Sequence, residues 1–165
     1  MVIKNILLTA FFALSTMSAA WASNLQLSNL DEVSANSTAG TITFSCNVAQ
    51  DNSWRNQTNY DAIWVFMKYS TDGGATWHHA SMAGSGVNPA GFSIPAQFQN
   101  QFEIMVPADQ KGFFIQRSGQ ASGSVALSGV QFVWNYGLDG LSSAVAQAAN
   151  TRNCYPFACF CIGLF

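Results

Sequence analysis

Hydrophobic and polar residues alternate from residue 40 to residue 48. The apolar positions are Ile42, Phe44, Cys46 and Val48, and the polar positions are Thr41, Thr43, Ser45 and Asn47. This two-residue period predicts a β-strand with one buried face and one solvated face. Residues 61–69 are instead apolar on both faces, which predicts a central strand that is covered on both sides.

Further short apolar runs, separated by turn residues, predict the rest of the fold. The runs are residues 102–106, 113–117, 124–127 and 130–134, and the turns are residues 72–74, 88–91, 107–112 and 118–120. No segment after residue 22 keeps a 3.6-residue apolar period. The pattern therefore predicts an all-β domain, a single antiparallel β-sandwich of about seven to nine short strands over residues 23–141.

The first 22 residues have the form of a secretory signal peptide. Lys4 lies in a short charged region, residues 6–20 are apolar, and cleavage is expected after Ala22 because residues 20–22 (AWA) fit a signal-peptidase site. The apolar run is shorter than the roughly 20 residues of a transmembrane helix. We expect an exported domain (periplasmic, cell-surface or extracellular) with no membrane contact after cleavage.

Residues 142–165 break the strand pattern. Residues 143–149 are alanine-rich and compatible with a short helix or a linker, whereas residues 154–165 are apolar, aromatic and cysteine-rich without alternation. Exposure of such a sequence would promote aggregation. We therefore expect an irregular, poorly ordered tail.

The four cysteines are placed unevenly. Cys46 stands alone in a predicted strand, whereas Cys154, Cys159 and Cys161 lie within the last dozen residues, with the spacing C-x4-C-x-C. Structural zinc sites more often use paired C-x2-C elements, and cysteines so spaced form no disulfide framework around a core. We expect Cys46 to be a small buried apolar residue.

A motif of the form S-x-D-x-G-x-T-W follows the apolar segment 61–69. It is an Asp-box, in which Asp and Thr hydrogen-bond the hairpin backbone, Gly adopts positive φ and Trp packs beneath. Asp72, Gly74, Thr76 and Trp77 would take these roles. The motif predicts a structural hairpin rather than a reaction.

Asp-boxes also occur in sialidases, whose propellers repeat the motif. This chain of 165 residues has one copy and is too short for such a propeller. Its three arginines are Arg55, Arg117 and Arg152, and the last lies in the expected tail, which argues against an arginine triad. A sialidase-type hydrolase is the least favoured interpretation, and it predicts turnover of a fluorogenic sialoside.

Charged and titratable residues limit the chemistry further. Only 8% of residues are charged, and the absence of a basic stripe argues against nucleic acid as a partner. His78 and His79 are adjacent, so on a strand one would point inward and one outward. No G-x-S-x-G or H-E-x-x-H motif occurs. We expect no catalytic residue, no metal and no cofactor.

Aromatic residues offer a candidate binding surface. Trp64 and Trp134 lie within predicted strands, which favours core positions. Trp54 and Tyr136 flank loops and are the candidate ligand-contacting aromatics, with a glycan or another exported protein as the candidate partner. The partner itself is unknown from the sequence.

Five segments together resemble the N-terminal module of a family of secreted bacterial proteins that carry a formylglycine-generating-enzyme (sulfatase-modifying factor) domain after it. The segments are residues 52–55 (NSWR), 59–69 (NYDAIWVFMKY), 77–80 (WHHA), 106–118 (VPADQKGFFIQRS) and 130–140 (VQFVWNYGLDG). The resemblance spans roughly residues 40–141. It implies a non-catalytic accessory β-sandwich, and the alternative is a carbohydrate- or surface-binding module that uses exposed aromatics.

The chain departs from that family after residue 141. The family continues into its enzyme-like domain, whereas this sequence continues into the cysteine-rich tail, whose cysteines match no motif of that domain. We therefore carry over no catalytic residue and expect a truncation or a reading-frame change at the domain junction. Sequencing the genomic locus tests this expectation, because it requires a sulfatase-modifying-like frame downstream.

Overall fold

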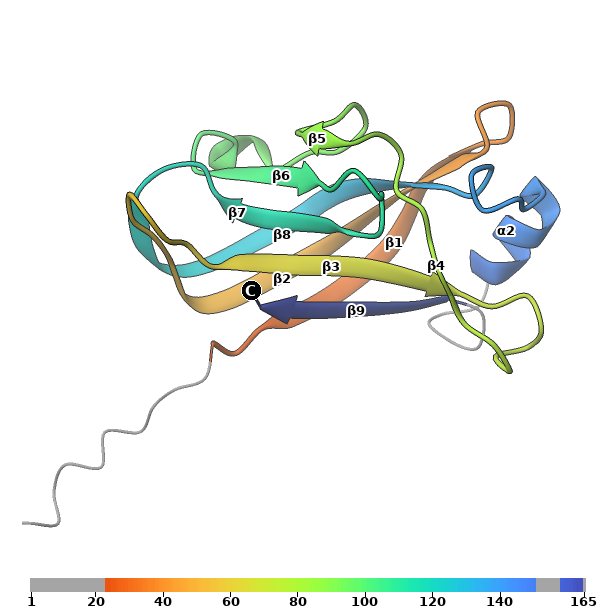
Figure 1. The fold of residues 1–165 in the computed structure, drawn as a ribbon, viewed down its shortest axis with the longest axis horizontal. Helices are drawn as coiled ribbons and strands as arrows, with labels where there is room; N and C mark the ends of the chain where they lie inside the picture. The colour runs from red at the N-terminus through yellow and green to blue at the C-terminus, as the bar shows by residue number, and fades with distance from the viewer. Residues whose placement is uncertain (1–22, 151–157, 165) are drawn as a thin grey trace, which may run out of the picture.

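The computed structural model describes the backbone of residues 23–150 and 158–164 and the side chains of residues 23–147. Within these residues the chain is mainly β, with two antiparallel sheets (Figure 1). The predicted all-β sandwich is thereby confirmed. The predicted signal peptide, residues 1–22, lies outside the described residues.

The first sheet has the order β1-β2-β8. Its strands are β1 (Gln26–Asn36), β2 (Thr41–Arg55) and β8 (Ala121–Asn135). The pairing of β2 with β8 shifts after Cys46, where Gly129 adopts φ 85° and its N–H donates to the Asn47 side chain at 3.0 Å. This bulge joins the predicted runs 124–127 and 130–134 into one strand.

The second sheet has the order β4-β3-β7-β6-β5, and β9 also pairs with β3. Its strands are β3 (Ala62–Tyr69), β4 (His78–His79), β5 (Gly86–Val87), β6 (Phe102–Val106), β7 (Phe113–Arg117) and β9 (Ala158–Leu164). The described helices are the 3-10 helix η2 (Ala96–Phe98) and the α-helix α2 (Ser143–Asn150). No helix in the described part of the chain is long and apolar enough to cross a membrane.

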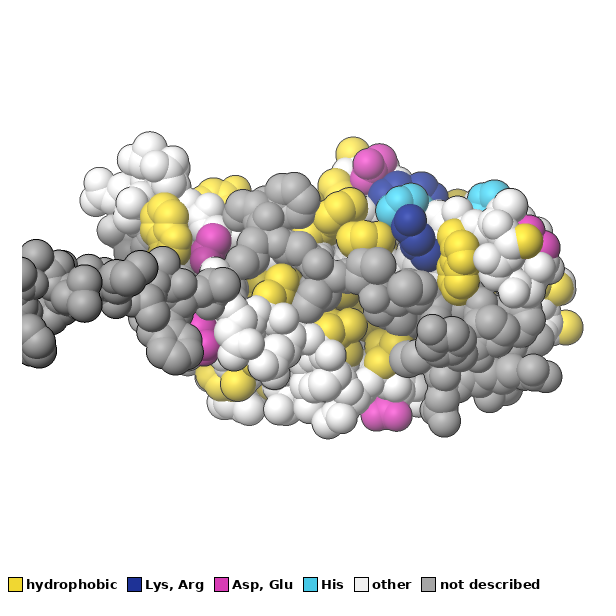
Figure 2. All heavy atoms as spheres, turned by 90° about the horizontal axis from the view of Figure 1, so that it is seen from below, with side chains coloured by type: hydrophobic (Ala, Val, Ile, Leu, Met, Phe, Trp, Pro, Cys, Tyr) yellow, Lys and Arg dark blue, Asp and Glu magenta, His cyan; other side chains and the backbone are white. Residues whose placement is uncertain are grey.

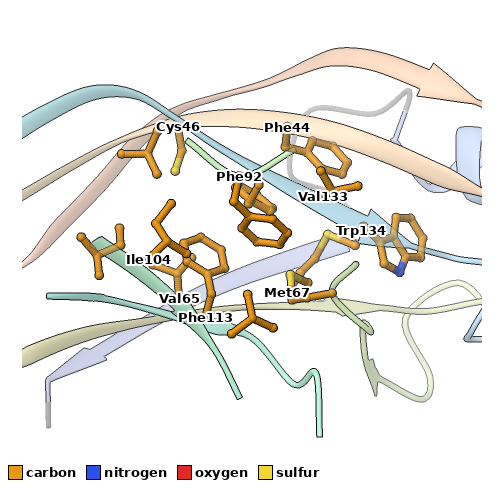
Figure 3. Packing of buried hydrophobic residues seen from close by; sticks show 14 of the residues in the cluster. Phe44, Cys46, Val65, Met67, Phe92, Ile104, Phe113, Val133 and Trp134 are labelled. Carbon is orange, nitrogen blue, oxygen red and sulfur yellow. The ribbon is translucent and has the colours of Figure 1, made fainter. Parts of the chain in front are cut away.

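Side chains from both sheets fill the space between them (Figure 3). The predicted apolar face of β2 is buried in full. Phe132 of β8 lies 5.5 Å from Phe44 of β2 and 5.1 Å from Phe113 of β7, measured between ring centroids, so it links the two sheets. Burial of each such side chain contributes about 1.5–3 kcal/mol. Burial also raises the pKa of Cys46 to about 12, so this thiol stays neutral.

The two faces of β3 differ. Ile63, Val65 and Met67 point inward and are buried, whereas Trp64 and Phe66 point outward and are half-buried. β3 is the central strand that the pattern predicts, but Trp64 is half-buried on the outward face and not in the core between the sheets, so its assignment to the core was wrong. β3 is interior because β7 and β9 pair with its two edges, and hydrogen-bonded neighbours cover edges rather than faces.

The tail differs from the irregular segment that the sequence pattern predicts. Residues 143–150 form α2, one of the two alternatives, and Ala146 is fully buried against the core. Residues 158–164 form β9, which pairs antiparallel with β3 (Figure 1). Strand pairing uses the backbone and so does not require alternating side chains. β9 covers N–H and C=O groups that an open edge of β3 would expose.

Candidate functional site

The Asp-box forms the connection between β3 and β4. The Asp72 carboxylate accepts hydrogen bonds from the Thr76 hydroxyl at 2.5 Å and the Thr76 N–H at 2.9 Å. The Ser70 hydroxyl donates to Asp72 and accepts from the Gly74 N–H, each at 2.8 Å. Gly74 has φ 95°, a conformation that a side chain would strain. These contacts fix the hairpin and place β4 beside the end of β3.

The electrostatics of the hairpin support a structural role. Hydrogen bonds from Thr76, and then from Ser70, hold the pKa of Asp72 well below its ordinary value of 3.8. Trp77, which we expected to pack beneath the hairpin, is 38% exposed. The β3–β4 loop extends beyond the end of the sandwich, so it does not lie over the core (Figure 1).

His78 and His79 contact opposite sides of the sheet. The His78 ring lies 5.5 Å from the ring of Tyr69, an inward residue, and the His79 ring lies 5.3 Å from the ring of Phe66, an outward residue. Both histidines are nevertheless exposed, because β4 is a two-residue strand at the margin of the sheet.

Of the two candidate ligand-contacting aromatics, only Trp54 is exposed. Trp54 is 40% exposed near the end of β2, where its N–H donates to Asp61 at 2.9 Å. Tyr136 is 3% exposed, so the expectation that it lies on the surface was wrong. It continues the inward positions of β8 and packs edge-on against Trp134, with ring centroids 6.0 Å apart.

A polar cluster that the sequence reasoning missed joins three distant segments. Asp139 accepts hydrogen bonds from the Ser81 hydroxyl at 2.6 Å, the Ser81 N–H at 3.0 Å and the Trp134 indole at 2.7 Å. Lys111 donates to the Ser81 hydroxyl at 2.6 Å and lies 3.8 Å from Asp139. We call these four residues the Asp139 clamp. The sequence gives one indication of this cluster: Asp139 is an acidic residue in a turn, and the chain has few charged residues.

The short contact between Lys111 and Ser81 does not activate a nucleophile. A serine attacks when a neighbouring base takes its proton. Here the Ser81 hydroxyl donates to Asp139, and Lys111 is paired with the same carboxylate. Ser81 is also buried. The arrangement favours a structural role for the clamp.

The outward face of the second sheet carries a row of apolar side chains. Trp64 of β3 lies opposite Phe114 of β7, which in turn lies opposite Met105 of β6. Phe66 stands beside Trp64, with ring centroids 4.4 Å apart. All four side chains are half-buried. We call them the apolar row, and none of them was a site candidate in the sequence.

A hollow of about 440 Å³ adjoins the apolar row, and its lining residues are Trp64, His79, Pro107, Asp109, Lys111 and Phe114. The loop between β6 and β7 packs tightly against Trp64 in the wall of this hollow. The Trp64 indole donates to the Lys111 carbonyl at 3.2 Å, and a Cβ on Gly112 would lie only 2.6 Å from the indole nitrogen. Lys111 also ties this loop to the Asp139 clamp, so the walls of the hollow are held in place.

Charged side chains of both signs line this hollow, namely Lys111 and Asp109, and Lys68 lies beside the lining residue His79. Lys68 pairs with His79 across β3 and β4, so both residues face outward. Burial, and then the charges of Lys68 and Lys111, lower the pKa of His79 below its ordinary value of 6.5, so this histidine is neutral at pH 7. Figure 2 shows histidine, Lys or Arg and Asp or Glu side chains beside hydrophobic ones along one margin of the molecule.

The described part of the chain contains no group of three His, Cys, Asp or Glu side chains placed to hold a metal ion. Cys154 and the side chains of Cys159 and Cys161 lie outside the described residues.

Comparisons of the chain with protein-family models, with curated proteins and with solved structures find no match. The fold and the surface therefore define the class by themselves. It is a β-sandwich with a locked hairpin and, on one outward face, an apolar hollow whose lining carries both a lysine and an aspartate.

Proposed function

We propose that this chain is a non-catalytic accessory β-sandwich module of an exported formylglycine-generating-enzyme-like protein. The proposal starts from the resemblance of five sequence segments to the N-terminal module of that family. It assigns the chain a fold that accompanies an enzyme-like domain and performs no reaction itself.

The observation that carries the proposal is the Asp139 clamp. Lys111 belongs to the segment 106–118, and Trp134 and Asp139 belong to the segment 130–140. Ser81 directly follows the segment 77–80. The Ser81, Trp134 and Asp139 side chains are buried and hydrogen-bond to one another, and Lys111 joins them from the wall of the hollow. Residues used in this way support a shared fold rather than shared catalysis.

Two experiments test this proposal. Sequencing the genomic locus should find a formylglycine-generating-like frame directly downstream, and its absence would argue against the family. The purified chain should leave the cysteine of a sulfatase-type substrate peptide unmodified. Conversion of that cysteine to formylglycine, followed by mass spectrometry, would rule out a non-catalytic module.

A second candidate function is a carbohydrate- or surface-binding module. The observation that favours it is the hollow beside the apolar row, where Trp64 and Phe114 offer ring surface next to polar groups. Because Tyr136 is buried, the binding surface in this candidate differs from the pair expected from the sequence. A glycan array with Trp64→Ala and Phe114→Ala variants tests it, with Trp54→Ala as the control.

A further inference from the structure

We propose that the outer edge of β9 pairs with β9 of a second copy of this chain, so that the second sheets of two copies join into one continuous sheet. Pairing of this kind links the backbone N–H and C=O groups of two strands across the interface. The inference goes beyond both proposed functions and depends on neither, because it concerns a sheet edge and not an enzyme-like neighbour or the hollow.

β9 is the last strand of the second sheet on its side. Val65 of β3 pairs with Phe113 of β7 and also with Ile162 of β9. A strand residue has one partner on each side, so β7 and β9 lie along opposite edges of β3 (Figure 1). Within the described residues, no strand pairs with the other edge of β9.

The other strands at the margins of the sheets have features that limit pairing. β4 and β5 have two residues each. β1 has two register shifts and carries Asp31 and Glu32. Residues 81–83 and 93 cover residues 131–135 of β8 with backbone hydrogen bonds. Short strands, charges, bulges and covering loops are the means by which proteins block pairing at sheet edges.

β9 has none of these features in the described part of the chain. It spans seven residues, its register with β3 has no shift, and its sequence ACFCIGL has no charged residue and no proline. A long, regular, apolar edge pairs readily with another strand. The edge of β9 is therefore the sheet edge best suited to a strand from another molecule.

The sequence of β9 favours its own copy as the partner. Antiparallel pairing about a twofold axis at Cys161 places Phe160 opposite Ile162 of the second copy, and this pair occurs twice. Aromatic and β-branched residues form favourable cross-strand pairs, and no like charges meet. The same arrangement of β1 about its central residue would instead place two Asp31 residues opposite each other.

Self-pairing also closes the assembly. The contact uses the same residues on both copies, which is the property of a twofold interface. Each copy contributes one outer edge of β9, so the pairing of two copies occupies both edges and leaves none for a third. The expected product is a dimer and not a fibre.

The test is sedimentation of the full mature chain, residues 23–165, under reducing conditions from about 1 µM to about 100 µM. We expect a dimer whose fraction rises with concentration. Cys161→Glu places two like charges opposite each other only in the dimer, and should raise its dissociation constant roughly tenfold. Cys159→Glu is the matched control, because its charge lies opposite Gly163 of the second copy and beside Lys68 of β3. It should change the constant less than about threefold.

Hydrogen exchange shows whether β9 stays on β3 in these variants. Successive N–H groups of an antiparallel strand point to opposite edges. In the dimer both sets of β9 amides should be protected, whereas in the monomer only the set bonded to β3 should be. Protected amides over residues 63–69 in Cys161→Glu would show that the variant has lost the dimer and not the pairing within the chain.

Cross-linking provides a second measurement that does not require an added charge. The double variant Cys154→Ser, Cys159→Ser keeps Cys161, and the double variant Cys154→Ser, Cys161→Ser keeps Cys159. Copper phenanthroline with oxygen accepts the two electrons that two thiols release when they join. Opposed strand residues lie within the Cα distance of a disulfide. The chain that keeps Cys161 should therefore form the disulfide dimer at least about tenfold faster. Cys46 is buried with a pKa raised to about 12, so it should not react.

Four results would overturn the proposal. The first is a chain that stays monomeric at about 100 µM. The second is a dimer that both glutamate variants weaken equally, together with equal rates of cross-linking. The third is a monomer in which both sets of β9 amides are protected, which would assign the edge to another segment of the same chain. The fourth is assemblies that keep growing with concentration, which would rule out closure.

Discussion

The two sheets of this protein have similar inward faces and different outward faces. In the first sheet the outward positions of β2 include Thr43, Ser45 and Asn47, which are polar and partly exposed. In the second sheet the corresponding positions of β3 include Trp64 and Phe66. A sandwich needs apolar residues only where its sheets face each other. The apolar row is therefore not required by the sandwich architecture, and we interpret it as a contact surface.

The largest predicted effect is a difference in stability loss between substitutions of two neighbouring phenylalanines on β7. Phe113 is fully buried between the sheets, and Phe114 lies in the apolar row. Phe113→Ala should lower the free energy of unfolding by about 3–5 kcal/mol because it leaves a cavity. Phe114→Ala should lower it by about 1 kcal/mol because part of its surface already meets water. Urea denaturation followed by tryptophan fluorescence measures both, and equal losses would remove the distinction between the two faces.

A smaller loss of stability is expected when the Asp139 clamp is disrupted. Asp139→Ala should lower the free energy of unfolding by about 2–3 kcal/mol, because it leaves the Trp134 indole and the Ser81 N–H without their acceptor. Asp31→Ala, on the exposed face of β1, is the control and should change stability by less than about 0.5 kcal/mol. An Asp139→Ala protein as stable as the control would show that the clamp does not hold the loop.

The hairpin that positions β4 should contribute a pH-dependent part of stability. The pKa of Asp72 is lowered in the folded state, so its contribution is present above its ordinary pKa of 3.8 and is lost as the pH falls below that value. Asp72→Asn should therefore show a smaller drop in melting temperature than the wild type between pH 7 and about pH 3. Thr76→Ser keeps the hydroxyl and should follow the wild type. Identical pH profiles for all three proteins would contradict this role of Asp72.

The smallest effect concerns the pKa of His79. Burial, and then the charges of Lys68 and Lys111, lower this pKa below its ordinary value of 6.5. Lys68→Gln removes one of the two charges and should raise the pKa of His79 part of the way toward its ordinary value, an effect worth less than about 0.5 kcal/mol. NMR titration of the His79 ring measures this change, and an unchanged pKa in the variant would show that Lys68 does not act on His79.

Local patterns in the sequence predicted the sandwich well because strand alternation is a local property. The inward face of β2 could be read directly from residues 42–48, and the hairpin bonds of Asp72 and Thr76 follow from one short motif. β1 was not predicted, since its residues are mostly exposed and carry little alternation. The tail was expected to be irregular because backbone pairing with a distant strand leaves no pattern of side chains.

The candidate site was predicted poorly because it depends on contacts between distant segments. Trp64 was assigned to the core from a strand that is apolar on both faces, and only the sheet arrangement shows its outward position. Tyr136 was assigned to the surface from its place beside a loop, and only its packing on Trp134 turns it inward. Lys111 lies in the loop before β7, and no local sequence pattern predicts its hydrogen bond to Ser81, which is 30 residues away in the chain.

The sequence by itself determined the strand-forming segments, their inward faces and the locked hairpin, because each depends on residues a few positions apart. The tertiary structure decided which apolar residues lie outside the core between the sheets and which aromatic and charged residues line a hollow. These features arise when β3, β4 and the loop before β7 come together. Local periodicity carries no information about which face of a strand the opposite sheet will cover.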